Sequence, residues 1–353
     1  MQFYLLLFVI TLLIQFIPAK TNKKYLFRSI ATFVPLFLYG ALRYDCNDMN
    51  EYESFYSFAH GSAWFNEINE HFEYGWALFN FWAPSFNFVL VAQTLIVFAS
   101  YAFIFYKVIP PKYSWLAVVI LFLGGDKSIY FITAMRNSVA IAMLIASIPL
   151  IRERKLWQFA IVAVVAGFFH TTAWVMFPLA YIVGRNSVMT KKEVIAWLAV
   201  LAFLLVTPID TIVGNILPFI ETETFEKYSN YFEDSHTAGM LVKSVSVVMT
   251  CLMLSFVYKE SGEDKQVNTL SRLSLLFIYF GFMGTLNARG SQYYIMPLLL
   301  ATVLLFDKSK NQIVRYGFTA LVLAYLAYGL FQVEMTSIYS AFFTFKSSLD
   351  FTL

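Results

Sequence analysis

Three arginines and one histidine interrupt or border the apolar stretches of this sequence: Arg43, Arg136, Arg289 and His170. An ionisable residue in a membrane segment costs on the order of a few kcal/mol unless it is paired or faces a cavity, so such residues are candidates for function. A guanidinium can bind a phosphate or pyrophosphate through two parallel hydrogen bonds. A neutral imidazole can accept the proton of a hydroxyl group. These residue types predict a site that binds an anionic phosphate group.

One acidic residue and one amide lie close to these basic residues in the sequence, and a second acidic residue begins a separate segment. Asp48 follows Arg43 by five residues, and Asn137 stands beside Arg136. Glu73 opens the amphipathic segment EYGWALFNF. Neighbouring positive charge favours the ionised form of a carboxyl group, so a carboxylate near the arginines would be available as a base.

Each basic candidate also has a structural interpretation. Arg43 could anchor a helix end or pair with Asp45 or Asp48. Arg289 could be an ordinary loop arginine, and His170 could be a hydrogen-bonded core histidine. The functional interpretation is favoured if the candidates gather at one depth of the membrane.

The composition is that of a multi-spanning membrane protein. The 353 residues are 59% hydrophobic and 13% charged, whereas soluble domains contain roughly 25% charged residues. The first 19 residues lack a basic start and a cleavage site, so we expect a retained helix rather than a signal peptide. The two cysteines have no zinc-site spacing, and no P-loop or dinucleotide fingerprint is present. The sequence therefore predicts no metal, no cofactor and no nucleic-acid partner.

Apolar runs near the membrane-spanning length of about 20 residues recur along the chain. The run 156–184 is too long for one ordinary helix, so we expect two short helices that meet at His170. We therefore predict an all-α, polytopic membrane protein with about twelve transmembrane helices (range 10–13). We expect no soluble domain, so that residues 1–353 form a single integral membrane domain. The other expected spans are roughly 1–19, 26–42, 86–106, 113–124, 128–150, 192–207, 239–258, 270–287, 291–306 and 312–332.

The positions of Lys and Arg predict how these spans are oriented. With both termini outside, every basic cluster in a short loop falls on the cytoplasmic side, and two acidic loops at about 43–77 and 208–238 lie outside. The four basic candidates then share one depth near the outer face. This convergence favours a site for an anionic lipid head group, with a pathway for small ions as the alternative. The clusters are Lys20 with Lys23, Lys24 and Arg28; Lys107 with Lys112; Arg152 with Arg154 and Lys155; Arg185 with Lys191 and Lys192; Lys259 with Lys265 and Arg272; and Lys308 with Lys310 and Arg315.

Four segments resemble motifs of the EpsG branch of the Wzy-type polysaccharide polymerases. They are ALRYDCNDMNEY with Arg43, Asp48 and Tyr52; FEYGWALFNF with Glu73 and Gly75; MRNSVAIAMLIASIPLIRERKLWQFAIVAVVAGFFHTTAW with Arg136, Asn137 and His170; and NARGSQYYIMP with Arg289, Tyr293 and Pro297. The segments span residues 40 to 300. Asn47 stands where the family usually has a glycine, and the arginine–aspartate spacing is one residue shorter. Asp45, Asp48 and Glu51 therefore stay open as the acid of the first motif.

The resemblance implies a GT-C-like, metal-independent glycosyltransferase in the bacterial inner membrane, with its active site facing the periplasm or outside. Such an enzyme joins oligosaccharide repeat units carried on undecaprenyl pyrophosphate, for exopolysaccharide or O-antigen, and releases the lipid pyrophosphate. A chain-length regulator is a possible further partner. The resemblance implies catalytic roles for Asp48 and His170, pyrophosphate binding by Arg136 and Arg289, and substrate contacts for Arg43, Asn137, Tyr52, Glu73 and Tyr293.

Two other functions stay open at this point. A ligase would use the same carrier and pass a finished polymer to a different acceptor. A transporter would flip the lipid-linked oligosaccharide, and such a protein is expected to carry cavity arginines across the full depth of the membrane rather than on one side.

Overall fold

The computed structural model describes residues 2–43, 48–61, 72–124, 134–207, 240–281 and 288–335. Every element in these ranges is helical, which confirms the all-α prediction for the described part of the chain. Two compact units form, one from residues 1–182 and 326–353 and the other from residues 183–325. The single-domain organisation stays a prediction.

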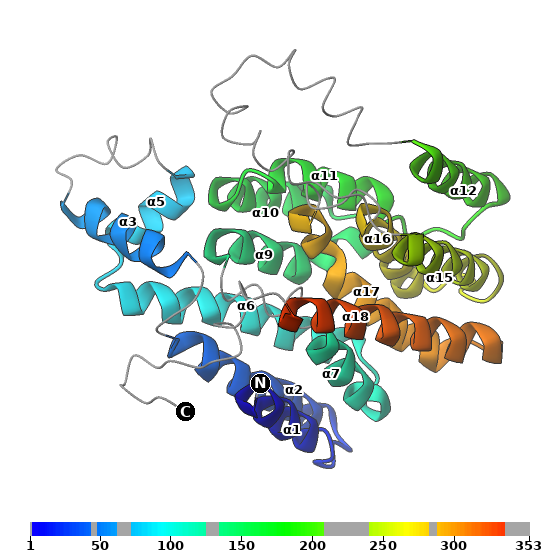
Figure 1. Cartoon of the computed structure of the whole chain (residues 1–353), viewed down its shortest axis with the longest axis horizontal. Coiled ribbons are helices and arrows are strands. Elements are labelled where there is room, and N and C mark those ends of the chain that lie inside the picture. The colour runs from blue at the N-terminus through cyan, green and yellow to red at the C-terminus, as the bar shows by residue number, and fades with distance from the viewer. Residues whose placement is uncertain are drawn as a thin grey trace. The chain divides into compact units, whose positions relative to one another are not determined.

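The first unit is built on α2, α6, α9 and α10, which pack in that order (Figure 1). Short connections join α1 to α2 and α9 to α10, and because the two helices of each pair pack against each other, they run in opposite directions. The side chain of Ser85 accepts a hydrogen bond from the Phe88 nitrogen (3.1 Å) and caps the start of α6. The elements of this unit are α1 (Gln2–Ile14), α2 (Asn22–Ala41), α3 (Met49–Gly61), α5 (Tyr74–Trp82), α6 (Phe86–Val108), η1 (Pro111–Tyr113), α7 (Ser114–Leu123), α9 (Met135–Arg152), α10 (Leu156–Phe169) and α11 (Ala173–Val183).

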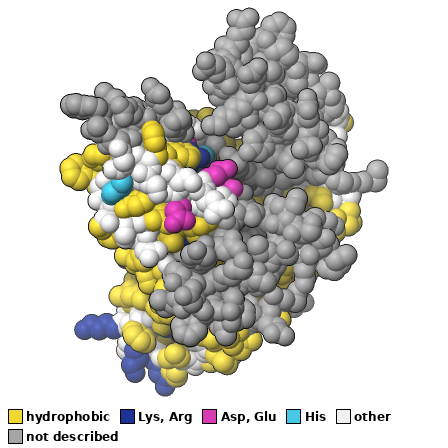
Figure 2. Space-filling model, turned by 60° about the vertical axis from the view of Figure 1, so that its left-hand side comes forward, with side chains coloured by type: hydrophobic (Ala, Val, Ile, Leu, Met, Phe, Trp, Pro, Cys, Tyr) yellow, Lys and Arg dark blue, Asp and Glu magenta, His cyan; other side chains and the backbone are white. Residues whose placement is uncertain are grey.

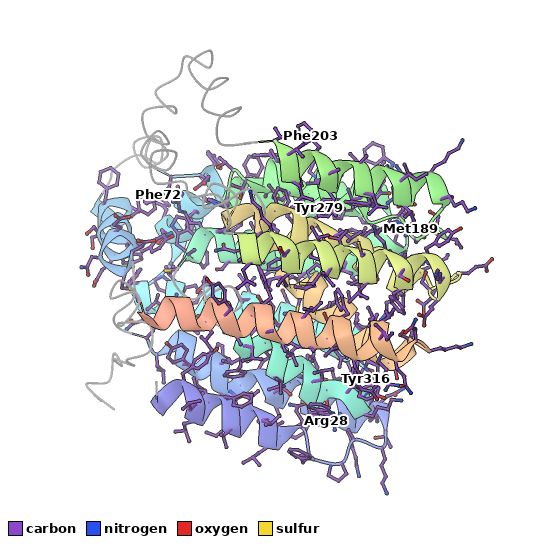
Figure 3. All side chains as sticks on the ribbon, turned by 45° about the vertical axis from the view of Figure 1, so that its right-hand side comes forward. Arg28, Phe72, Met189, Phe203, Tyr279 and Tyr316 are labelled. Atoms are coloured by element: carbon purple, nitrogen blue, oxygen red, sulfur yellow. The ribbon has the colours of Figure 1, made fainter. Side chains whose placement is uncertain are left out.

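The up-and-down order of these helices separates two chemically different ends. One end holds the basic α1–α2, α6–α7 and α9–α10 connections, where Arg28 donates to the carbonyl of Pro111 at 2.7 Å. The other end holds the last turn of α2 and the start of α9, and it also holds the turn after α10. Figure 3 shows Arg28 and Phe72 far apart along the helix direction. The basic loops of this unit therefore lie opposite to Arg43, Arg136 and His170.

The second unit contains α12, α15, α16, α17 and η6, with α16 and α17 in the most extensive contact. Arg272 of α16 is fully buried and binds both carboxylate oxygens of Glu193, at 2.6 and 2.9 Å. The bounds are α12 (Lys191–Val206), α15 (Met240–Lys259), α16 (Lys265–Phe280), α17 (Ala288–Lys308), η6 (Ile313–Gly317) and α18 (Phe318–Met335), and α18 continues into the first unit.

Several helices are long and apolar enough to cross a membrane. Within the described ranges these are four helices of at least 18 residues, namely Phe86–Val108, Met135–Arg152, Leu241–Lys259 and Ile313–Leu330. Shorter apolar helices are Tyr4–Ile14, Pro111–Leu123, Leu156–Phe169 and Ala173–Val183. Hydrophobic side chains also cover much of the described surface in Figure 2. The chain is therefore a multi-pass membrane protein, and the total of about twelve spans stays a prediction.

The segment 43–77, whose place outside the membrane stays a prediction, contains α3 and the start of α5. In α3, Tyr52, Phe55 and Ala59 recur at helical spacing and form one buried face. That face packs against Trp76 and Ala77 of α5. The acidic residues on the opposite face gave the segment a loop-like composition, although the period of its apolar residues is that of a helix.

The division of 156–184 into two short helices is confirmed. Helix α10 ends at Phe169, and His170 adopts an extended conformation with φ of −158°. The nitrogen of Ala173 then donates to the carbonyl of His170 at 3.0 Å, and α11 begins. The turn fixes the backbone of His170 between two helix ends.

Candidate active site

Glu73 joins two of the predicted site residues, Arg136 and His170, into one cluster. One carboxylate oxygen of Glu73, Oε2, accepts a hydrogen bond from the Arg136 guanidinium. The other oxygen, Oε1, lies 3.0 Å from Nδ1 of His170 and 3.3 Å from the backbone nitrogen of Thr171. Three segments that are far apart in the sequence therefore meet at this carboxylate.

Helix ends position all three members of the cluster. Glu73 is the N-cap residue of α5, Arg136 lies in the first turn of α9, and His170 follows the last residue of α10. Helix α10 packs against both α5 and α9. A helix N-terminus favours a negative charge, so the start of α5 helps to keep the carboxylate of Glu73 ionised.

The charge on Glu73 is stabilised strongly. Burial by itself would raise the pKa of this carboxyl group, but the hydrogen bond with His170 and the charge of Arg136 outweigh burial and lower the pKa to about 2. Glu73 is therefore a carboxylate at neutral pH. It is an acceptor of hydrogen bonds and not a donor.

Aromatic side chains enclose the arginine of this cluster. The guanidinium carbon of Arg136 lies 4.3 Å from the ring centroid of Phe72, a cation–π contact. The hydroxyl group of Tyr52 also interacts with the Arg136 guanidinium. Burial raises the pKa of Tyr52, so its hydroxyl group keeps its proton and can donate or accept a hydrogen bond. Tyr52 packs edge-to-face on Trp76 at 5.6 Å.

Asp48 lies near the cluster but is exposed to solvent. It precedes α3 in a left-handed conformation with φ of 66°, and its carbonyl accepts a hydrogen bond from the Tyr52 nitrogen at 3.0 Å. Its charge reaches the Tyr52 hydroxyl group. The alternative Asp45 lies outside the described residues, and the alternative Glu51 is exposed on α3.

Arg43 is held by the helices that support α9. Its guanidinium donates to the carbonyl of Gly40, to Oγ1 of Thr94 at 3.0 Å and to Oε1 of Gln93 at 3.0 Å. Gln93 in turn donates to the hydroxyl group of Ser138 at 2.5 Å. Since Ser138 lies two residues after Arg136, this network links α2, α6 and the first turn of α9. Arg43 thus has a structural role, and its contact with a substrate stays a prediction.

The remaining predicted residues are Asn137, Tyr293 and Arg289. Asn137 is buried beside Arg136 at the start of α9. Tyr293 is fully buried within α17 of the second unit. Arg289 is the second residue of α17, and its side chain lies outside the described residues. Their contacts with a substrate stay predictions.

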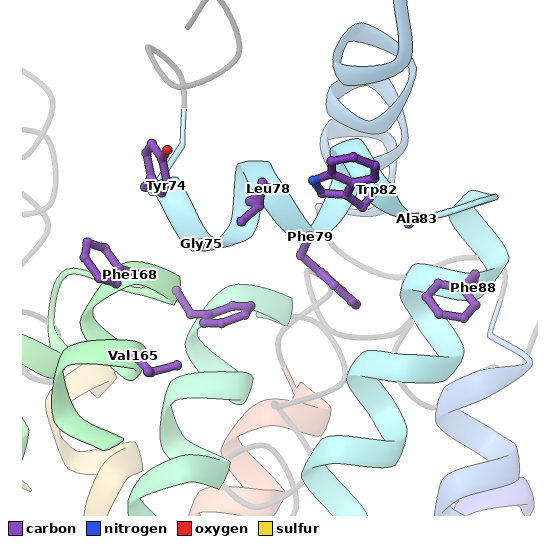
Figure 4. Close-up of a pocket in the computed structure, with 10 residues that line it drawn as sticks. Tyr74, Gly75, Leu78, Phe79, Trp82, Ala83, Phe88, Val165 and Phe168 are labelled. Atoms are coloured by element: carbon purple, nitrogen blue, oxygen red, sulfur yellow. The ribbon is translucent and has the colours of Figure 1, made fainter. Parts of the chain in front are cut away.

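An apolar pocket of about 840 Å³ adjoins the cluster. It lies between α5, the end of α10 and the start of α6, and Figure 4 shows Tyr74, Leu78 and Trp82 of α5 across from Val165 and Phe168 of α10. Tyr74 follows Glu73 directly, and Phe168 precedes His170 by two residues. A hydrocarbon chain could therefore lie in this pocket while its polar end reaches the charged cluster.

The sequence indicated the basic residues of this site, Arg136 and His170, but it did not indicate that Glu73 joins them. Its position at the start of an amphipathic segment was the available signal, because an acid at a helix N-terminus is a common cap. The contributions of Gln93 and of the Thr171 nitrogen had no such signal. Within the described residues, no three His, Cys, Asp or Glu side chains are grouped as metal ligands would be.

A model of the EpsG family matches residues 24–347 of this sequence. The matched range includes all the residues of the cluster and also Arg43, Arg289 and Tyr293. No curated protein and no solved structure matches the chain. The further link to Wzy-type polymerases stays a prediction. Because the match extends over most of the chain, this protein is a member of the EpsG family.

Proposed function

We propose that this protein is a polysaccharide polymerase that works at the outer face of the bacterial inner membrane. It would transfer a growing glycan from undecaprenyl pyrophosphate onto a hydroxyl group of the next lipid-linked repeat unit and release the lipid pyrophosphate. Membership of the EpsG family indicates a role in exopolysaccharide biosynthesis, which supports this proposal.

The observation that carries the proposal is the meeting of Arg136 and His170 at Glu73. The reaction has two chemical requirements, a positive group for the departing pyrophosphate and an acceptor for the proton of the attacking hydroxyl group. An arginine and a histidine on neighbouring helix ends can meet both requirements at one place.

Arg136 keeps binding capacity although it pairs with Glu73. A guanidinium has five N–H donors, and the Glu73 contact uses one of its terminal nitrogens. Its Nε is buried and has no hydrogen-bond partner among the described residues, whereas the side chain as a whole is 23% exposed. A pyrophosphate can therefore reach the arginine without first removing Glu73.

The neighbouring apolar pocket supports a lipid-linked substrate. Its lining is aromatic and aliphatic, and it opens beside a charged cluster at the end of the helices. A substrate with a hydrocarbon chain and an anionic head group has the same two parts in the same order. The alternatives Asp48 and His170 both stay open here as the proton acceptor.

A strain that lacks the gene, complemented with variants, tests this proposal. We expect Arg136→Ala to reduce long glycan at least ~100-fold, because removing one group that stabilises developing charge typically has an effect of this size. Single lipid-linked units should accumulate on the outer face. Arg289→Ala should have the same effect if its guanidinium also binds the pyrophosphate. Gel analysis of glycan length and extraction of the lipid-linked intermediates provide the measurements.

Arg152→Ala is the matched control, since Arg152 lies at the opposite end of the same helix and pairs with its neighbour Glu153 at 2.9 Å. It should restore polymer to the wild-type length. Full-length polymer from Arg136→Ala, at an equal amount of inserted protein, would contradict the proposed site. In the deletion strain, finished polymer left on the carrier would favour a ligase, and single units retained on the cytoplasmic face would favour a transporter.

A further inference from the structure

We propose that Glu73 is a positioning residue that holds a proton on Nδ1 of His170, so that Nε2 of His170 takes the proton of the attacking hydroxyl group. This inference rests on the proposed function for the reaction itself. The proton arrangement at His170 is independent of that function and can be measured separately.

The contact with Glu73 determines which ring nitrogen of His170 carries the proton. Nδ1 of His170 lies 3.0 Å from Oε1 of Glu73. Because a carboxylate only accepts hydrogen bonds, Nδ1 must be the donor in this contact. In the neutral imidazole the other nitrogen, Nε2, then has a free lone pair.

The carboxylate of Glu73 is held in place by two hydrogen-bond donors and by its own backbone. Arg136 donates to Oε2, and the Thr171 nitrogen donates to Oε1 at 3.3 Å. The backbone of Glu73 begins α5, and its carbonyl accepts the first hydrogen bond of that helix from Ala77 at 3.0 Å. The carboxylate therefore has both a fixed backbone and fixed partners, and it can orient the imidazole ring.

Nε2 of His170 can accept a hydrogen bond from a substrate hydroxyl group. The His170 side chain is only 8% exposed, and Nε2 has no hydrogen-bond partner among the described residues. A buried polar atom without a partner is unfavourable, so a hydroxyl group that reaches this nitrogen gains a hydrogen bond there. Asp48, in contrast, is an exposed carboxylate that water already solvates.

These contacts give a balanced proton transfer. The oxygen of the acceptor hydroxyl group forms a bond with the anomeric carbon of the donor glycan. The bond from that carbon to the pyrophosphate breaks, and the electron pair leaves with the pyrophosphate beside Arg136. The hydroxyl proton passes to Nε2 of His170, and the negative charge of Glu73 stabilises the imidazolium that forms.

The effect of Glu73→Gln follows from the donors around position 73. Two donors compete for the carbonyl oxygen of the glutamine, the charged Arg136 guanidinium and the neutral Thr171 nitrogen, which lies 3.3 Å from Oε1 in the wild type. Because hydrogen bonds from a charged donor are the stronger ones, the glutamine turns its carbonyl oxygen towards Arg136. Its NH₂ group then faces His170 and donates to Nδ1, which moves the ring proton to Nε2. The variant thus inverts the tautomer of His170 with almost no change in side-chain volume.

Nitrogen-15 NMR of histidine-labelled protein in lipid nanodiscs, at a pH where the imidazole is neutral, measures this tautomer. His170→Gln assigns the signals by their loss, and Glu53→Gln, an exposed acid on α3, is the matched control. We expect the proton on Nδ1 in the wild type and in Glu53→Gln, and on Nε2 in Glu73→Gln. A wild-type His170 with its proton on Nε2 would overturn the proposal, even if Glu73→Gln failed to fold.

Kinetics with lipid-linked repeat units add a second criterion. Glu73→Gln should lower kcat at least ~100-fold, the range expected for loss of acid–base catalysis. KM should stay the same or fall, because Arg136 loses a competing negative charge. A raised KM with an unchanged kcat would instead make Glu73 a substrate-binding residue and contradict the proposal. If the wild type shows no polymerase activity, the proposed function fails, whereas the NMR result still decides the tautomer.

Discussion

Glu73 makes the stability of this protein sensitive to acid. Its carboxyl group has an ordinary pKa of 4.5 that is lowered to about 2 in the folded protein, where the contacts with His170 and Arg136 outweigh its burial. A carboxyl group with a lowered pKa contributes stability that is fully present above its unfolded pKa. That contribution is lost as the pH falls from about 4.5 towards 2.

We therefore expect Glu73→Gln to be less stable than the wild type at pH 7 by on the order of 3 kcal/mol. The difference should shrink as the pH falls below 4.5, because the wild type then binds a proton at this position. Thermal unfolding of the two proteins in detergent across this pH range checks the prediction. A difference in stability that stays constant down to pH 2 would show that the carboxylate is not stabilised by its neighbours.

At the scale of single residues, the sequence predicted which residues belong to the site better than it predicted their contacts. Arg136 and His170 could be found because an ionisable group among apolar neighbours is costly and therefore informative. The joining role of Glu73 could not be found, since a carboxylate at the edge of an acidic loop has an ordinary composition around it. The network of Arg43, Gln93 and Ser138 depends on how three helices are packed, which no local pattern reports.

The placement of α5 against α10 depends on Gly75. A Cβ atom at this position would lie 2.8 Å from the carbonyl oxygen of Phe168, which is backbone and cannot rotate away. Gly75→Ala should therefore push α5 away from α10 and separate Glu73 from His170. Overpacking of this kind costs about 1–3 kcal/mol.

Gly61→Ala is the matched control, because a Cβ at the last residue of α3 would meet nothing within 4 Å. We expect Gly75→Ala to lower the melting temperature and glycan synthesis together, and Gly61→Ala to leave both unchanged. Thermal unfolding and glycan gels measure the two effects. Equal behaviour of the two variants would mean that the close approach of α5 and α10 is not needed for the site.

Among the elements, the apolar runs were predictable, and these include the shorter runs at 113–124 and 192–207, which match α7 and α12. Helices α6 and α15 fall close to their predicted ranges because a continuous apolar run of that length has few other structures open to it. Helix α3 was missed because its apolar positions are separated by acidic residues and its overall composition is that of a loop. Helix α9 starts at Met135, later than the predicted start at 128, and residues 125–133 lie outside the described part.

At the scale of the whole chain, the orientation in the membrane is the central prediction. The first unit already separates its basic connections from the end that holds the Glu73 cluster. Alkaline phosphatase fused after Gly61 should be active, because that position is expected outside the cell membrane. The same reporter fused after Arg154 should be inactive. Activity in the reverse pattern would place the cluster at the cytoplasmic face and exclude an outer-face polymerase.

For the whole molecule, the sequence could predict the depth of a residue in the membrane but not its lateral position. Sequence reasoning brought Arg289 and Tyr293 to the same site as Arg136 through the shared depth of their helices. The described contacts join Arg136, Glu73 and His170 within the first unit alone. Depth along the membrane normal follows from charge distribution, whereas lateral position depends on packing that the sequence pattern does not contain.

The most direct test is glycan extension by the purified protein in lipid nanodiscs. Lipid-pyrophosphate-linked single repeat units, isolated from the deletion strain, serve as both donor and acceptor. The account predicts that wild-type protein makes longer glycans without added metal and releases one lipid pyrophosphate for each unit joined. Arg136→Ala should do neither, and Arg152→Ala should match the wild type. Wild-type protein that neither extends the glycan nor releases lipid pyrophosphate, or Arg136→Ala that does both at the wild-type rate, would contradict the account.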